Sequence, residues 1–333
     1  MKSVLKALVV PLVSVFAFGA NAQDKVRTPA GEAENVGWSS VICSGNPFQC
    51  STLKASGQLF AESGQNKVVL ISHGSQGVDA RMYDYVKDLR KAGFAALVID
   101  HWTPRGVSTT HNDYVEAARK GANETNIAFD SMTAAEWLRS TRGFRKVGSI
   151  GESQGGAAAI ILAQKWPFQF LERNMERLYQ GSRFAASPLD AVVGLYGFCG
   201  FRNTGRDAYV TTPFLFITGS EDDSTPSRYC ESYVPYMNSR GGNARIVILE
   251  GEGHSFDAPY RRYRNQSGPQ YAKCNIVVEK DHVINVNTGA RIDGQNSAPL
   301  FERCKGRGYQ TGHGKDRFIA VPHWISFFKE TLK

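Results

Sequence analysis

The hydrophobic residues of this chain fall into short, almost continuous runs separated by longer amphipathic stretches. The short runs predict buried β-strands at Lys67–Ser72, Phe94–Asp100, Lys146–Ile150, Asp190–Tyr196, Pro213–Thr218 and Ala244–Leu249. Apolar positions with helical spacing predict helices at Asp79–Ala92, Asn126–Arg139, Pro226–Arg240 and Pro322–Leu332. Apolar strands that alternate with helices indicate a mostly parallel central sheet covered on both faces, which is an α/β fold.

Two segments depart from this alternation. Phe168–Ser187 mixes apolar and charged residues and fits either a small flap over a site or a surface helix. The segment at about residues 260–318 is polar and glycine-rich, and its runs at 276–278 and 283–286 predict a hairpin. We expect a single α/β domain over residues 23–333, with the 260–318 segment as an insertion.

The N-terminus has the pattern of a secretory signal peptide. Lys2 and Lys6 precede an apolar run from Ala7 to Phe18, and Ala20-Asn21-Ala22 follows as a cleavage site. We therefore expect residues 1–22 to be a signal peptide and the protein to be periplasmic or secreted. No later stretch is long and apolar enough to span a bilayer, so we expect no membrane anchor.

The chain has six cysteines, an even number that favours disulfides in an exported protein. Cys43–Cys50 suits a local loop and Cys274–Cys304 a clasp on the 260–318 segment, which leaves Cys199–Cys230. The spacing does not match a zinc site, so we predict no metal. The net charge of +8 is modest and spread along the chain, and we find no nucleic-acid motif. The oligomeric state stays open.

The most informative motif is Gly151-Glu152-Ser153-Gln154-Gly155. It lies between a predicted strand and a small-residue helix, which is the context of a nucleophile elbow. Glycine is needed on either side of such a turn because the neighbouring strand and helix leave no room for a side chain. Ser153 is therefore the candidate nucleophile.

Two further residues complete a candidate triad. Glu221, Asp222 and Asp223 follow one predicted strand, and His254 follows the next, just after Gly251 and Gly253. The order serine, acid, histidine at the ends of parallel strands is the one that the α/β-hydrolase arrangement requires. His254 would accept the serine proton, and a carboxylate would orient its ring. We choose Asp222 as this acid, while Asp223 would cap the following helix.

An oxyanion hole needs two backbone N–H donors. Gln154 N–H provides one, and Ser75 in the His73–Gly77 loop is the preferred second donor, with Gln76 next. We expect His73 to be structural. Arg105 either binds a substrate carboxylate or belongs to a structural turn.

The chain resembles the dienelactone hydrolase-like branch of the α/β-hydrolase superfamily. The matching motifs are HGSQG at 73–77, DHWTPRG at 100–106, GESQGG at 151–156, LYGFCG at 195–200, GSEDDSTP at 219–226 and GHSFD at 253–257. The resemblance implies hydrolysis of esters or lactones without a cofactor, and its G-x-x-D pattern supports Asp222. Dienelactone hydrolases proper use a cysteine nucleophile, whereas this chain has Ser153.

The main hypothesis is a serine hydrolase that cleaves a small-molecule ester or lactone through an acyl-enzyme. One alternative is a serine peptidase of the prolyl-oligopeptidase type, because its elbow also reads G-x-S-x-G-G. Another alternative is a non-catalytic binding protein on a hydrolase fold.

Overall fold

The computed structural model describes residues 25–44, 49–108, 114–179, 189–206, 208–294 and 296–333. The predicted signal peptide at residues 1–22 lies outside the described residues. So does the C-terminal part of the predicted flap segment, from residue 180 onward.

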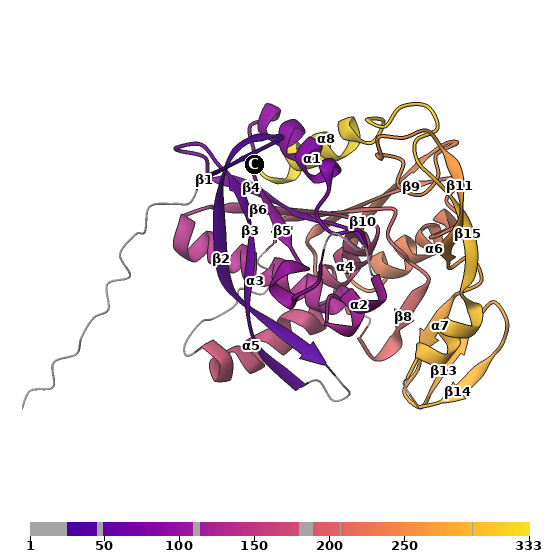
Figure 1. The fold of residues 1–333 in the computed structure, drawn as a ribbon. Helices are drawn as coiled ribbons and strands as arrows, with labels where there is room; N and C mark the ends of the chain where they lie inside the picture. Colours follow the sequence, from indigo (N-terminus) through magenta and orange to yellow (C-terminus); the bar gives the residue numbers. More distant parts are fainter. Residues whose placement is uncertain (1–24, 45–48, 109–113, 180–188, 207, 295) are drawn as a thin grey trace, which may run out of the picture.

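A nine-stranded sheet forms the centre of the described part of the chain (Figure 1). In spatial order its strands are β1 (Lys25–Thr28), β2 (Gly31–Ser44), β3 (Gln49–Phe60), β5 (Ala95–Asp100), β4 (Lys67–Ser72), β6 (Lys146–Glu152), β7 (Ala191–Leu195), β9 (Pro213–Gly219) and β10 (Asn243–Leu249). The six strands from β5 to β10 are parallel to one another, and β1, β2 and β3 pair antiparallel. Each strand predicted from an apolar run is present in this parallel part.

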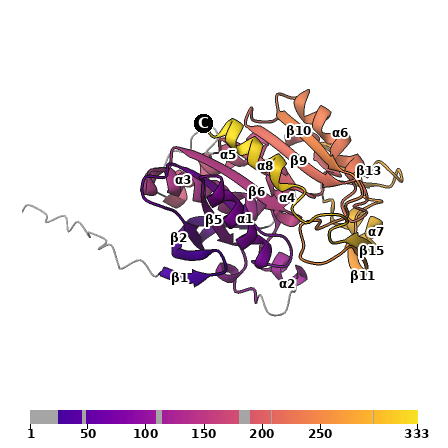
Figure 2. The same cartoon turned by 90° about the horizontal axis from the view of Figure 1, so that it is seen from above.

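Helices cover both faces of the sheet, as the apolar strands required (Figures 1 and 2). One face is covered by α3 (Glu124–Arg142), α4 (Gln154–Leu162), α5 (Lys165–Tyr179) and α6 (Ser227–Asn238), and the other by α1 (Ala80–Lys91) and α8 (Val321–Thr331). Successive residues of β4 enter opposite cores, since Val68 and Leu70 face the first set and Val69 and Ile71 the second. The predicted α/β fold class is confirmed.

The three N-terminal strands are a correction to the sequence prediction, which placed the first strand at β4. In β2, buried and exposed positions largely alternate, and the buried ones include small or polar residues such as Ala33 and Ser40. The hydrophobic signal of such a half-buried strand is weak compared with that of a fully buried parallel strand. The disulfide Cys43–Cys50 joins β2 to β3 at directly paired positions, as predicted.

The α5 helix agrees with a surface helix rather than a flap. Phe168 and Leu171 are buried in the main core, and Phe170 stacks on Phe129 of α3 with ring centroids 5.6 Å apart. The helix therefore packs on the body of the molecule along its described side chains.

The 260–318 segment contributes to two small sheets on the same side of the molecule as α6 (Figure 1). β11 (Tyr263–Gln270) pairs with β15 (Gly306–Thr311), whereas β12 (Ile276–Val278), β13 (His282–Asn285) and β14 (Arg291–Asp293) join β8 (Phe201–Asn203). The predicted hairpin is present as β12 and β13. The remaining elements are η1 (Thr103–Arg105), α2 (Tyr114–Arg119), η2 (Thr204–Arg206) and α7 (Ala298–Cys304).

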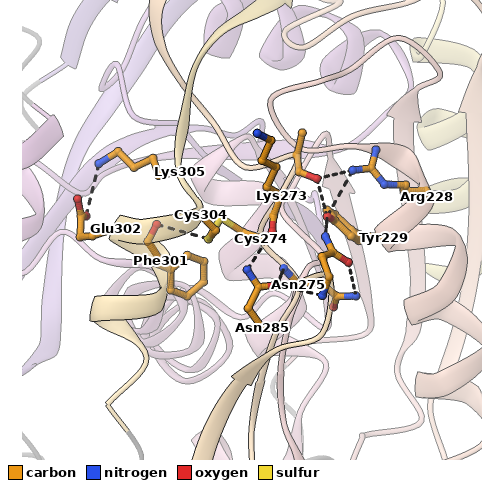
Figure 3. Close-up of a disulfide and its surroundings, with 12 residues drawn as sticks. Arg228, Tyr229, Lys273, Cys274, Asn275, Asn285, Phe301, Glu302, Cys304 and Lys305 are labelled. Atoms are coloured by element: carbon orange, nitrogen blue, oxygen red, sulfur yellow. Dashed lines mark hydrogen bonds and ion pairs between the residues drawn. A yellow bond between two sulfur atoms is a disulfide. The ribbon is translucent and has the colours of Figure 1, made fainter. Parts of the chain in front are cut away.

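The other two disulfides also agree with the predicted pairing, so all six cysteines are paired. Cys274–Cys304 joins α7 to the loop before β12 (Figure 3). The same loop contacts α6, where the Tyr229 hydroxyl donates to the Ala272 carbonyl at 2.7 Å. Cys199–Cys230 ties the chain after β7 to α6, so α6 anchors both the loops of the sheet and the 260–318 segment.

Candidate active site

Ser153 lies in a strained turn between β6 and α4. Its backbone has φ 51° and ψ −107°, a conformation that residues other than glycine rarely adopt. A Cβ on Gly151 would lie 2.3 Å from the Gly155 carbonyl oxygen, and a Cβ on Gly155 would lie 2.4 Å from the Ser72 carbonyl oxygen. The glycines of the motif are therefore required by close backbone contacts, and they hold the serine at the carboxyl end of the sheet.

The structure brings Ser153, His254 and Asp222 into one hydrogen-bonded chain. Ser153 Oγ lies 3.0 Å from His254 Nε2, and His254 Nδ1 lies 2.8 Å from Asp222 Oδ2. The three residues follow the parallel strands β6, β10 and β9, whose carboxyl ends share one edge of the sheet. Because an ionised carboxylate only accepts, Nδ1 carries the ring proton and Nε2 is left to accept the serine proton.

The three candidate acids separate clearly in their contacts. Asp222 is buried and faces His254, whereas Glu221 forms an ion pair with Arg262. The prediction that Asp223 caps α6 is wrong, because Asp223 instead accepts from the backbone N–H of Gln310 at 2.6 Å and pairs with Arg264. The backbone N–H groups of Ser224 and Thr225, which precede α6, instead donate to Asp222.

Each oxygen of the Asp222 carboxylate accepts two hydrogen bonds. Oδ1 accepts from the backbone N–H groups of Ser224 at 2.9 Å and Thr225 at 2.8 Å. Oδ2 accepts from the Thr225 hydroxyl at 2.8 Å and from His254. These donors stabilise the charged carboxylate in a buried site. Thr225 was not identified from the sequence, although its place three residues after the acid is typical of such a local turn.

The oxyanion loop (residues 73–77) follows β4 beside the nucleophile. It forms a turn in which the Gly77 N–H donates to the Gly74 carbonyl at 3.3 Å, with Ser75 and Gln76 at its centre. The Gly74 N–H already donates to Glu152 Oε1 at 2.7 Å. The N–H of the next residue, Ser75, takes no part in the hydrogen bond that closes such a turn. The N–H of Gln154 opens α4 and has no partner within the helix.

His73 is the first residue of the oxyanion loop, and its side chain is buried. Burial and the neighbouring His101 lower the pKa of His73 to about 3, so the ring is neutral at physiological pH. Its Nε2 accepts from the His101 backbone N–H at 3.1 Å, which leaves Nδ1 to donate to the Gly74 carbonyl at 2.7 Å. His73 thus connects the ends of β4 and β5 and holds the oxyanion loop.

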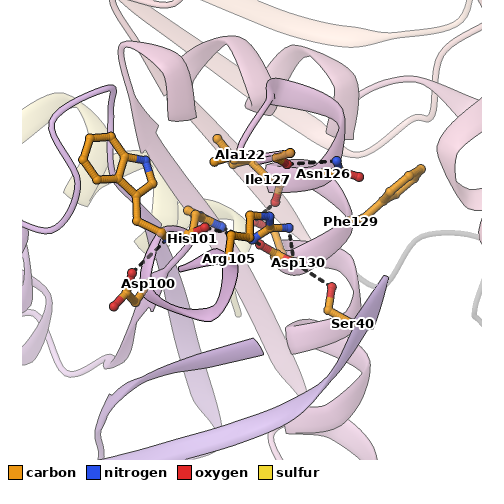
Figure 4. Close-up of polar contacts among 12 residues, drawn as sticks. Ser40, Asp100, His101, Arg105, Ala122, Asn126, Ile127, Phe129 and Asp130 are labelled. Carbon is orange, nitrogen blue, oxygen red and sulfur yellow. Dashed lines mark hydrogen bonds and ion pairs between the residues drawn. The ribbon is translucent and has the colours of Figure 1, made fainter. Parts of the chain in front are cut away.

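Arg105 requires a correction, because its side chain does not face the site. The guanidinium is fully buried and pairs with Asp130 at 2.8 Å, and it also donates to the His101 carbonyl at 2.9 Å (Figure 4). Burial acts to raise the pKa of Asp130, but Arg105 and His101 outweigh it and bring this pKa to about 2. A charge held in this way is not available to a substrate carboxylate, and the turn that contains Arg105 is structural.

Two aromatic residues enclose His254, and the sequence reasoning did not place either beside it. The ring centroid of Tyr196 lies 4.9 Å from that of His254, and the ring centroid of Tyr309 lies 5.3 Å from it. The His254 backbone also bonds β15, donating to the Gln310 carbonyl at 2.9 Å and accepting from the Gly312 N–H at 2.8 Å. The 260–318 segment therefore holds the histidine loop directly. Burial raises the pKa of Tyr309 to about 12, so its hydroxyl stays protonated at neutral pH.

Within the described ranges, no group of three histidine, cysteine, aspartate or glutamate side chains is arranged to hold a metal ion. Among the helices of the same ranges, none has the length and apolar character to cross a membrane.

The strand order and the placement of the three residues at strand ends define an α/β-hydrolase fold. Comparison with known proteins agrees with this class: the model of the dienelactone hydrolase family matches residues 56–170. This match spans the oxyanion loop and the nucleophile elbow. Over this stretch the chain is similar to the dienelactone hydrolase family.

Individual relatives are distant. A Bradyrhizobium protein named probable 2-oxo-3-(5-oxofuran-2-ylidene)propanoate lactonase is 24% identical over 222 residues, which cover 65% of this chain and 84% of the relative. Among solved structures, dienelactone hydrolase from Anabaena variabilis is 21% identical with a TM-score of 0.44, and the match covers 68% of this chain and 90% of that one.

Proposed function

We propose that this protein hydrolyses carboxylic esters or lactones with Ser153 as the nucleophile, His254 as the general base and acid, and Asp222 as the residue that orients His254. The observation that carries the proposal is the continuous Ser153–His254–Asp222 hydrogen-bonded chain at a strained elbow. A serine hydroxyl needs an adjacent base to react at neutral pH, and the 3.0 Å contact with Nε2 provides one.

The reaction has two halves. In the first, Ser153 Oγ attacks the carbonyl carbon while its proton moves to His254 Nε2, and the tetrahedral intermediate forms. The C–O bond to the leaving group then breaks, and Nε2 returns the proton to the departing alkoxide, leaving an acyl-enzyme. In the second half, water gives its proton to Nε2 and attacks the acyl carbon, and the serine departs with that proton. For a lactone, acid and alcohol leave as one hydroxy acid.

Backbone N–H groups stabilise the negative charge on the carbonyl oxygen in both halves. The donors are Gln154 N–H at the start of α4 and Ser75 N–H in the oxyanion loop. The helix dipole adds to the first donor because its positive end points at the site. The proposed steps need side chains, backbone groups and water, and they include no metal or organic cofactor.

A fluorophosphonate probe and a short p-nitrophenyl ester test the assignment. The wild-type protein should be labelled and should hydrolyse the ester, whereas Ser153→Ala should lose both properties with an unchanged circular dichroism spectrum. Ser140→Ala, an exposed serine on α3, serves as the matched control and should behave as wild type. Ester hydrolysis that persists in Ser153→Ala would reject the nucleophile assignment.

We also propose that the protein acts in the periplasm or outside the cell. Three disulfides support an oxidising compartment, and the sequence pattern of residues 1–22 supports export. Fractionation of expressing cells should recover the protein outside the cytoplasm, and N-terminal sequencing should begin at Gln23. Recovery of full-length protein in the cytoplasm would contradict export.

A further inference from the structure

A cluster of polar side chains lies beneath the oxyanion loop, and the steps of ester hydrolysis use none of them. Its members are Asp79, Arg81, Tyr85, Glu152, Tyr196 and Asp257. All are buried except Asp79, which is partly buried. They come from four separate parts of the chain, and each part adjoins a residue of the candidate site.

Arg81 is the centre of this cluster. Its guanidinium lies 2.7 Å from Asp79, 3.1 Å from Glu152 and 3.6 Å from Asp257. It also donates to the Tyr196 hydroxyl at 3.2 Å, and that hydroxyl donates to Asp257 at 2.6 Å. One cation therefore joins the start of α1, the elbow, the end of β7 and the histidine loop.

Glu152 links this cluster to the oxyanion loop. It is the residue before the nucleophile, and its Oε1 accepts the Gly74 N–H at 2.7 Å. A Cβ on Gly74 would lie only 2.7 Å from either carboxylate oxygen of Glu152. The absence of a side chain at residue 74 thus creates the space that the carboxylate occupies.

The Gly74 residue is held from both sides. Its N–H is bound by Glu152, and its carbonyl accepts from His73 Nδ1 at 2.7 Å. With both ends of this residue fixed, the plane of the next peptide is restricted, and that peptide carries the Ser75 N–H. The direction of the proposed oxyanion donor therefore depends on the Glu152 carboxylate and on the cation beside it.

The charges make the arrangement depend on Arg81. Burial raises the pKa of Glu152, Arg81 opposes this change, and Asp257 adds to it. A buried carboxylate that loses its cation either takes up a proton or moves toward water. Either response weakens or displaces the acceptor of the Gly74 N–H.

We propose that Glu152 and Arg81 are positioning residues of the ester hydrolase, which orient the Ser75 N–H toward the oxyanion and tie this loop to the segment that carries His254. The inference rests on the proposed function. A purely structural role would change the free energy of unfolding, whereas a positioning role also lowers kcat selectively, because the oxyanion exists only in the transition state and the intermediates.

The test compares kcat and KM for p-nitrophenyl acetate in Glu152→Gln, Arg81→Lys and wild type. Misplacing a catalytic group by about 1 Å can cost about 100-fold in rate, so we expect kcat to fall about 10- to 100-fold with KM within about threefold. Affinity for a trifluoromethyl ketone, whose adduct carries an oxyanion, should fall in parallel. The inhibition constant of p-nitrophenol, the alcohol product, should be the same as in wild type.

Asp190→Asn is the matched control. Asp190 likewise accepts a backbone N–H, that of Val147 at 2.8 Å, and pairs with Arg139, but it lies at the opposite ends of the strands. Its replacement should lower stability and leave kcat unchanged. Gly74→Ala gives an independent variant with Glu152 intact, and its added Cβ should displace the carboxylate and lower kcat in the same way.

The two proposals fail in different ways. If wild type is active, Ser153→Ala is inactive and the folded Glu152→Gln protein keeps the wild-type kcat, the positioning role is wrong and the nucleophile assignment stands. If Ser153→Ala retains activity, the proposed function itself is wrong. Equal losses of kcat in Glu152→Gln and Asp190→Asn would also overturn the positioning role, since they would indicate a general effect of destabilisation.

Discussion

Replacing Asp222 by asparagine is the sharpest test of the proposed triad. The substitution preserves the volume of the side chain, and the amide oxygen can still accept from the Ser224 and Thr225 N–H groups. The amide nitrogen would then occupy the position of Oδ2, 2.8 Å from His254 Nδ1. A donor at that position favours the His254 tautomer with its proton on Nε2, which cannot accept the Ser153 proton.

The expected effect follows from the loss of the base rather than from a loss of fold. A wrong tautomer in a triad lowers kcat by about 10⁴-fold, which corresponds to about 5 kcal/mol in activation free energy. The local turn keeps both of its backbone hydrogen bonds, so the free energy of unfolding should change far less than the activation free energy.

The assay is kcat for a p-nitrophenyl ester, combined with urea unfolding of the same protein. Glu221→Gln is the control, because Glu221 pairs with the exposed Arg262 and lies next to the proposed acid. It should retain kcat within about twofold. A loss of less than about tenfold in Asp222→Asn would show that His254 is oriented by other contacts and would refute the reasoning.

Three further predictions concern the surroundings of the site. Because the pKa of Asp130 is depressed from 3.8 to about 2, its ionised form contributes about 2 kcal/mol of stability at pH above 4, and this stability is lost as the pH falls through 2. In Asp130→Asn, the free energy of unfolding measured with urea should therefore decrease less between pH 4 and pH 2 than in wild type. The same pH profile in both proteins would contradict this. Tyr309→Ala should lower kcat/KM about 3- to 10-fold because the ring beside His254 is lost. Tyr309→Phe keeps the ring and should resemble wild type. Equal kcat/KM values for the two variants would exclude ring packing as the cause. Replacing Cys274 and Cys304 by serine removes a disulfide whose cysteines are 30 residues apart in sequence. The free energy of unfolding should fall by about 3–4 kcal/mol, and calorimetry should show a lower Tm. An unchanged Tm would mean that other contacts hold the 260–318 segment.

Much of the parallel sheet was predictable because its signal is local. Strands such as β4 are buried on both faces, so almost every residue is apolar, and the flanking helices have a different period. The N-terminal strands escaped prediction for the opposite reason. In β2 the buried positions hold residues such as Ala33 and Ser40, whose partners across the sheet and on α3 provide the burial.

The candidate site divides in the same way. Ser153 and His254 were identifiable because each has a glycine-rich context that local backbone geometry demands. For Arg105 the sequence left a substrate-binding role and a structural turn both open, because it shows the charge of Arg105 but not Asp130, its buried partner. Tyr309 was missed because no local pattern indicates that β15 passes beside the histidine loop.

The amino-acid sequence by itself determined the α/β class, the elbow, the order of the candidate triad and the family resemblance, since each depends on spacing along a few neighbouring residues. Only the tertiary structure decided that Asp222, and not Glu221 or Asp223, faces His254, because the three share one turn and differ in direction alone. It also brought Arg81 against Glu152 and Asp257. Burial and charge pairing between distant segments arise from packing of the whole chain, and no local pattern encodes them.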